Sequence, residues 1–173
     1  MRERGFTLVE LLVALSIGLI LLTIAIPGYA YLLNASRLTA VTNDLVSAIH
    51  LARSEAINRG MRVTVCKTSS PMSTQPLCDS AADWPNGWLV FVDDGTRGVI
   101  DSGDTLLWVR DSAHSTVSIT SQNYSSFISY LPSGRSQGSN GLANGTIQIC
   151  VAGTRRDIII NITGRPRLDS GVC

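Results

Sequence analysis

Residues 6–26 read FTLVELLVALSIGLILLTIAI, an almost unbroken apolar run that contains one carboxylate, Glu10, and is followed by Pro27. At a rise of 1.5 Å per residue, about 20 such residues cross the roughly 30 Å hydrocarbon core of a bilayer. The run is longer than the apolar part of an ordinary signal peptide, about 7 to 15 residues, and no small-residue cleavage site follows it. The pattern therefore predicts a transmembrane helix over residues 6–27.

The start of this run has a second feature. Residues 5–12 read GFTLVELL, with Gly5 between a charged start and Phe6. This stretch resembles the processing site of type IV prepilins and type II secretion pseudopilins. The resemblance implies that residues 1–5 are a leader peptide, that prepilin peptidase cleaves after Gly5, and that the new terminal Phe6 is N-methylated. Glu10 and Pro27 also stand where that superfamily carries a Glu and a helix-kinking Pro.

The position of Glu10 inside the apolar run also needs a physical explanation. A carboxylate in the middle of a membrane costs about 2.5–3.5 kcal/mol on insertion scales, so such groups are usually paired. The run contains no Lys or Arg, and the nearest candidate partner is the α-amino group of a cleaved Phe6, in the same chain or in a neighbour. The resemblance favours the neighbour and thus a role of Glu10 in assembly with other pilin subunits. The alternative is a side chain that only reaches up to the lipid headgroups.

Apolar residues continue at helical spacing beyond Pro27. They recur three or four positions apart with polar residues on the other faces; the set is Leu38, Val41, Leu45, Ala48 or Ile49, Ala52 and Ala56. Gly60 follows Arg59 and can adopt the left-handed conformation that often ends a helix. Residues 28–60 are therefore predicted to form an amphipathic helix that continues the first, is bent at Pro27, and covers a soluble domain.

From Met61 onward the hydrophobic period becomes that of strands. Val63 and Val65 alternate with polar residues, and further β-rich runs cover 88–92, 106–109, 117–120, 127–131, 146–151 and 157–162. The Ser- and Gly-rich stretch 133–145 is predicted to be a mobile loop. We expect an α+β, pilin-like fold, in which the long kinked helix packs on an antiparallel β-sheet domain of residues 61–173.

Charge is balanced over the chain but not along it. The 14 basic and 13 acidic residues leave no bulk electrostatic case for nucleic-acid binding. Between Thr68 and Asp111 there are seven Asp and two Arg, whereas from Gly134 to the end there are five Arg and two Asp. The region 79–111 is therefore acidic, and the C-terminal part of the domain is basic.

The four cysteines allow three pairings, and we expect disulfides because the domain would lie outside the cytoplasm. Sequential pairing, Cys66 with Cys78 and Cys150 with Cys173, closes two short loops. Closing about 15 residues stabilises a fold by roughly 3 kcal/mol in the chain-entropy model. A zinc site is disfavoured because no Cys-x-x-Cys pair is present, and no metal or cofactor is expected.

Residues 92–104, VDDGTRGVIDSGD, raise the question of a calcium site. Their acidic spacing does not match an EF-hand loop, and Asp and Gly also suit a tight hairpin, which we favour. The runs GWLVFVDDG (87–95) and GDTLLW (103–108) around it resemble the minor pilins and pseudopilins of the FimT and GspH families. His50 and His114 have no nucleophile and carboxylate in a recognisable arrangement, so no enzyme is expected.

The stretch TGRPRL, residues 163–168, is the most informative part of the C-terminal region. Gly164 allows a turn and Pro166 keeps this point out of a central strand ladder. In an extended backbone Arg165 and Arg167 point to the same side, and planar guanidinium groups can clasp phosphate oxygens. Arg155 and Arg156 are expected in the preceding turn. A solvated basic hairpin end is the alternative.

Residues 164–167, Gly-Arg-Pro-Arg, also match the Gly-Arg-x-Arg pattern of FimT-type minor pilins, which bind DNA during natural transformation. The resemblance implies that Arg165 and Arg167 hold the DNA backbone and that Gly164 shapes the loop. It also implies a single-pass protein of the bacterial inner membrane with a periplasmic globular domain, later part of an extracellular pilus. We expect a minor type IV pilin that binds double-stranded DNA without base specificity. The alternative is a core minor pilin or secretion pseudopilin that primes filament assembly without DNA.

Overall fold

The computed structural model describes residues 7–173, apart from the side chain of Ile24, so the expected processing site at Gly5 and Phe6 lies outside the described residues. The chain divides into two compact units, one that ends at Ser36 and one that contains residues 37–173. Helix α1, Leu8–Arg59, contributes to both.

In the first unit, α1 exposes its apolar side chains. Leu8, Leu15 and Leu22 are all more than half exposed, and within residues 7–173 α1 is the one helix long and apolar enough to cross a membrane. The helix begins with an N-cap, because the backbone amide of Glu10 donates to the Thr7 hydroxyl at 3.3 Å. Pro27 lies within the helix and does not end it.

In the second unit, α1 carries the buried stripe that its periodicity predicts. Seven side chains are buried at spacings of three and four: Leu38, Val41, Leu45, Ala48, Ile49, Ala52 and Ala56. The helix ends at Arg59, and Gly60 follows with a φ of +64°, the left-handed conformation expected of a helix terminator. The amphipathic helix is thereby confirmed.

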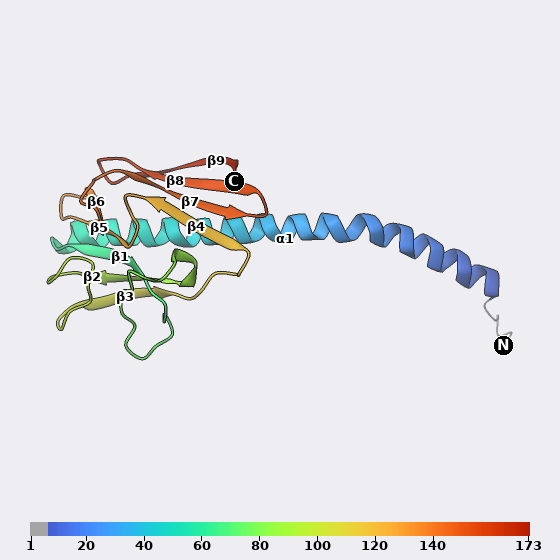
Figure 1. The fold of residues 1–173 in the computed structure, drawn as a ribbon, viewed down its shortest axis with the longest axis horizontal. Coiled ribbons are helices and arrows are strands. Elements are labelled where there is room, and N and C mark those ends of the chain that lie inside the picture. Colours follow the sequence, from blue (N-terminus) through green and yellow to red (C-terminus); the bar gives the residue numbers. More distant parts are fainter. Residues whose placement is uncertain (1–6) are drawn as a thin grey trace. The chain divides into compact units, whose positions relative to one another are not determined.

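Within residues 7–173, nine strands form two antiparallel sheets. The first sheet has the order β3-β2-β1-β5-β6, and the second has the order β4-β7-β8-β9. The strands are β1 Val63–Lys67, β2 Trp88–Val92, β3 Thr105–Arg110, β4 Val117–Gln122, β5 Phe127–Tyr130, β6 Ser136–Gly138, β7 Gly145–Val151, β8 Thr154–Ile160 and β9 Pro166–Val172, with a short 3-10 helix at Trp84–Asn86. Figure 1 shows β7, β8 and β9 on one side of the second part of α1, and β2 and β3 on the other.

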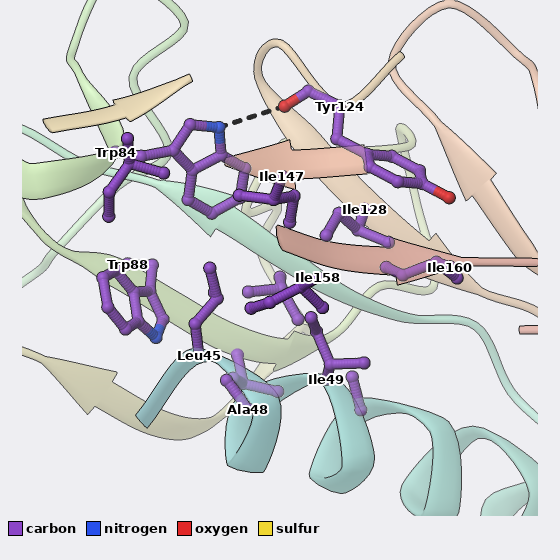
Figure 2. Close-up of a cluster of buried hydrophobic side chains, with 14 of the residues drawn as sticks. Leu45, Ala48, Ile49, Trp84, Trp88, Tyr124, Ile128, Ile147, Ile158 and Ile160 are labelled. Carbon is purple, nitrogen blue, oxygen red and sulfur yellow. Dashed lines mark hydrogen bonds between the residues drawn. The ribbon is translucent and has the colours of Figure 1, made fainter. Parts of the chain in front are cut away.

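A single main core joins the helix to both sheets. In Figure 2, Leu45, Ala48 and Ile49 of α1 face Trp88 of the first sheet and isoleucines of the second. Burying one such isoleucine stabilises the fold by roughly 1.5–3 kcal/mol. All core residues lie between Leu38 and Ile160, so the unit of residues 37–173 contains its whole core.

The sequence missed two strands. β6 lies inside the stretch 133–145 that was predicted to be a mobile loop, so that prediction is wrong for residues 136–138. β9, PRLDSGV, has little β-propensity, but its backbone pairs with β8 along seven register positions. Backbone pairing to an existing strand outweighs a weak intrinsic preference. Pro166 begins β9 at the edge of the second sheet, where its missing N–H leaves no ladder gap.

Both disulfides join the cysteines in sequence order. Cys66 in β1 is bonded to Cys78, and Cys150 in β7 is bonded to Cys173, the last residue. Cys173 follows β9, and its amide donates to the Gly153 carbonyl in the turn between β7 and β8, so the second bond fixes this end of the chain beside that turn. The pairing favoured from loop lengths is confirmed.

Candidate functional site

The β8–β9 hairpin ends in a tight turn that places Arg165 at its rim. The Gly164 amide donates to the Asn161 carbonyl at 2.9 Å, and the Asn161 amide donates to the Arg165 carbonyl at 3.3 Å. Gly164 has a φ of +76°, which favours glycine. The Asn161 side chain adds a further bond, since its Oδ1 accepts from the Arg165 amide at 3.0 Å.

The β5–β6 hairpin has a turn with the same hydrogen-bond pattern. The Gly134 amide donates to the Leu131 carbonyl at 2.8 Å, and the Leu131 amide donates to the Arg135 carbonyl at 3.0 Å. Gly134 also has a φ of +76°. We call residues 131–135 and 161–165 the paired glycine–arginine turns, because each places an arginine directly after a left-handed glycine.

The paired turns pack against each other although they belong to different sheets. Gly164 is buried, and a Cβ at this position would overlap the carbonyl oxygen of Gly134. The Tyr130 hydroxyl donates to the Gly164 carbonyl at 3.2 Å, and Nε of Arg53 donates to the Gly134 carbonyl at 3.1 Å. Side chains from α1 and β5 thus hold the two turns in place. Only glycine fits at position 164.

Tyr130 is the buried titratable group of this site. Burial raises its pKa well above the usual value, with a further upward contribution from Tyr124 and an opposing one from Arg53. Its hydroxyl therefore stays neutral and donates to the Gly164 carbonyl throughout the physiological range.

Between the turns lies an open hollow of about 760 Å³, lined by Arg53, Ser133, Arg135, Ile162, Thr163 and Arg165. We call it the arginine hollow. Three of its six lining residues are arginines and none is acidic. Arg135 and Arg165 are exposed, and Arg53 is half-buried. Within residues 7–173 none of the three forms an ion pair.

The other predicted arginines lie elsewhere. Arg167 is exposed in β9 opposite Ile159 and does not line the arginine hollow. Arg155 and Arg156 belong to β8 and not to the turn before it, so that prediction is wrong. They pair with Gly171 and Ser170, toward the end of the hairpin that the Gly164 turn does not occupy.

Arg155 is in addition engaged locally. Its Nε lies 3.0 Å from Oδ1 of the buried Asp157. Arg156 pairs with Ser170, which is about 10 Å along β9 from Arg167 at the usual strand rise. The short β7–β8 turn consists of Ala152 and Gly153, both at positive φ, so the strand ladder starts at Thr154 and already includes Arg155 and Arg156.

Sequence reasoning missed Arg53 and Arg135. The sequence pattern alone puts Arg53 among the polar residues of the helix and Arg135 in the predicted loop 133–145. A signal existed for Arg135: residues 133–135 read Ser-Gly-Arg and residues 163–165 read Thr-Gly-Arg, so both turns have a hydroxyl residue, a glycine and an arginine in order. No local signal marked Arg53, because its partner Gly134 is 81 residues away.

The acidic connection between β2 and β3 leaves the first sheet at the same end as the 131–135 turn, because Val92 and Tyr130 both oppose Val63. Two of its carboxylates bind the backbone of the connection itself. Asp101 accepts from the Thr96 amide, and Asp104 accepts from two further amides. The connection joins two paired antiparallel strands, which confirms the predicted hairpin. Within residues 7–173 no three His, Cys, Asp or Glu side chains are placed to hold a metal ion.

Comparison with known families agrees with this architecture. Residues 41–164 match the model of the type II transport protein GspH, which is well over half of the chain. The chain belongs to the GspH family. Residues 1–26 also match the prokaryotic N-terminal methylation motif, as the resemblance at residues 5–12 implies. No curated protein sequence matches the chain significantly.

Two solved structures share the fold of this GspH-family chain. Both are crystal forms of the type IV minor pilin FimU of Pseudomonas aeruginosa strain PAO1, each 16% identical to the chain, with TM-scores of 0.56 and 0.58. They cover 76% and 78% of this chain and 91% and 89% of their own. At this identity the likeness concerns the fold.

Membership in the GspH family makes this chain a minor pilin or pseudopilin, a structural subunit. The methylation motif implies processing by prepilin peptidase and assembly with other pilins, and the apolar helix implies a membrane anchor. His50 and His114 are both exposed, and His114 contacts its neighbour Thr116. The GspH match ends at residue 164, one position before Arg165.

Proposed function

We propose that this minor pilin binds extracellular double-stranded DNA without base specificity, for DNA uptake in natural transformation. The residues that bind are Arg165, in the turn that contains Gly164, and Arg167, in the adjoining strand β9. The observation that supports this most is the state of the two side chains. Both are exposed, and within residues 7–173 neither has a carboxylate within ion-pair distance. Exposed, unpaired guanidinium groups can bind phosphate oxygens without first breaking an internal contact.

The expected binding is weak and sensitive to salt. Each phosphate that a basic side chain neutralises contributes a slope of about −0.9 to a plot of log affinity against log salt concentration. Two to four such contacts give modest affinity for one subunit. Display of the domain on a pilus would then let retraction carry the bound DNA inward.

The test is a DNA mobility-shift titration of the full chain in a non-ionic detergent. Arg165→Ala combined with Arg167→Ala should abolish the shift, and the circular dichroism spectrum should stay unchanged because exposed, unpaired side chains contribute little to stability. Arg97→Ala is a control for the loss of one positive charge elsewhere on the domain, because its guanidinium lies over Phe127, a side chain outside the main core. An unaltered titration of the double variant would reject the DNA role.

The alternative function is filament priming without DNA, as a core minor pilin or a secretion pseudopilin. It is favoured by the family model, which describes a type II transport protein and ends before Arg165. A deletion strain separates the two functions. Piliated cells that cannot take up DNA support DNA capture, whereas loss of pili or of secretion supports the priming role.

A further inference from the structure

We propose that the arginine hollow binds a single phosphate group of the DNA backbone, with Arg135 and Arg165 as its ligands and Arg53 as the residue that positions the turn of Arg135. This inference rests on the proposed function, because DNA is taken as the source of the phosphate. It adds two residues, Arg135 and Arg53, that the Gly-Arg-Pro-Arg stretch does not contain.

The first support is the matched backbone of the two turns. In each, the residue before the glycine carries a hydroxyl, the glycine has a φ of +76°, and the arginine carbonyl accepts the closing hydrogen bond. Both arginines therefore leave equivalent backbone positions, and both line the same hollow. Two guanidinium groups that reach one space from different turns offer more N–H donors to a phosphate than either turn alone.

The second support is the charge around the hollow. Its lining contains three arginines and no carboxylate. By contrast, Arg59 at the end of α1 is paired with Glu55, and Arg62, between α1 and β1, is paired with Asp93. Within residues 7–173 none of Arg53, Arg135 and Arg165 has a carboxylate within ion-pair distance, so no direct ion pair neutralises the charge of the hollow. Ser133 and Thr163 in the lining add hydroxyl groups, and the volume of about 760 Å³ falls within the usual range of ligand pockets, roughly 300–1,000 Å³.

The third support is the rigidity of the backbone that carries the arginines. Arg53 donates to the Gly134 carbonyl, and Tyr130 donates to the Gly164 carbonyl. The buried Gly164 leaves no room for the turns to slide past each other. A site that is ordered before its ligand arrives loses less entropy on binding. Exposed lysines on a mobile loop would lack this property.

The experiment measures DNA binding by fluorescence anisotropy, with the full chain in a non-ionic detergent and a labelled duplex at several salt concentrations. Arg135→Ala should weaken binding about tenfold at low salt, the effect of losing one charge-assisted contact, and should reduce the salt slope by about 0.9. Arg135→Lys should keep the slope but recover only part of the affinity, because an ammonium lacks the planar fork of a guanidinium. Arg97→Ala removes the same charge outside the hollow and should leave both quantities unchanged.

A double-mutant cycle tests whether the two arginines share one phosphate. Arg135→Ala and Arg165→Ala together should weaken binding less than the product of the single effects, since the second loss acts on a contact already broken. Additive effects would overturn the shared site. DNA binding that depends on Arg165 but not on Arg135 would also overturn it while leaving the proposed function intact.

A second measurement separates failure of the site from failure of the DNA role. Inorganic pyrophosphate, compared with sodium chloride at equal ionic strength, should raise the melting temperature of the wild-type chain but not that of Arg135→Ala. If this shift occurs and the duplex does not bind, the phosphate site is supported and the DNA role is rejected. If no shift occurs, the site is rejected whatever the duplex does. A shift that persists in Arg135→Ala also rejects it.

Discussion

Replacement of Gly164 by Ala is the most direct test of the packed turns. Gly164 has a φ of +76°, and an added Cβ would overlap the Gly134 carbonyl, which belongs to the backbone and cannot rotate away. The left-handed conformation alone costs a residue with a Cβ about 1–2 kcal/mol. The overlap adds an overpacking cost of about 1–3 kcal/mol. We therefore expect Gly164→Ala to lower the free energy of unfolding by about 2–5 kcal/mol.

Gly153→Ala is the matched control. Gly153 also lies in a hairpin turn next to β8 and has a φ of +85°, but a Cβ there would meet nothing within 4 Å. Its cost should be the conformational part alone, about 1–2 kcal/mol. The difference between the two variants isolates the contact between the turns.

The assay is urea and thermal unfolding of a fragment that starts at Arg37, which contains the whole core. For a domain of this size, each 1 kcal/mol lowers the melting temperature by roughly 3–5 °C. Because Gly164 precedes Arg165, we also expect weaker DNA binding for Gly164→Ala at temperatures where it is still folded. Equal losses of stability for Gly164→Ala and Gly153→Ala would refute the packing of the paired turns.

Two further predictions concern buried polar groups. Asp93→Ala should lower the free energy of unfolding by about 3–5 kcal/mol in urea titrations. The reason is that the fully buried Asp93 carboxylate pairs with Arg62 at 2.7 Å, and its loss leaves the Arg62 charge without a partner. The control Asp94→Ala, at an exposed position, should have almost no effect. Stability should also fall as the pH rises above about 10. Burial raises the pKa of Tyr130 and Tyr124 in the folded state, whereas the same tyrosines ionise near pH 10 in the unfolded chain. Ionisation therefore stabilises the unfolded chain first. Unfolding midpoints measured between pH 8 and pH 11 check this, and Tyr130→Phe should flatten the decline; a decline as steep as in the wild type would contradict the assignment to Tyr130.

The sequence alone predicted the features whose signal is a local pattern of neighbouring residues. The apolar run and the three-and-four spacing from Leu38 to Ala56 specify α1, because a helix repeats every 3.6 residues and shows its buried face directly in the sequence. Alternation between apolar and polar residues located most strands for the same reason. The loops between Cys66 and Cys78 and between Cys150 and Cys173 are short, so this pairing has a low entropy cost of loop closure.

Strands whose pairing is decided by their neighbours were beyond the reach of local patterns. β6 is three residues long, and β9 has a Pro, an Asp, a Ser and a Gly among its seven. Neither has the alternating hydrophobicity that marks a strand. β6 is hydrogen-bonded to β5, and β9 is hydrogen-bonded to β8. The positions of β6 and β9 therefore follow from the register of β5 and β8, which other parts of the chain determine.

The residues of the candidate site also fall into those that local sequence predicted and those that only the tertiary structure revealed. Sequence located Gly164, Arg165 and Arg167 because turn chemistry and charge are local properties. Only the tertiary structure brought Arg53 and Arg135 to Arg165, because the three side chains come from a helix and from hairpins of two different sheets. It also removed Arg155 and Arg156 from the turn and placed them in β8. Contacts between segments that are distant in the sequence depend on the order and register of the strands. Strand order and register in turn follow from packing the whole core around α1.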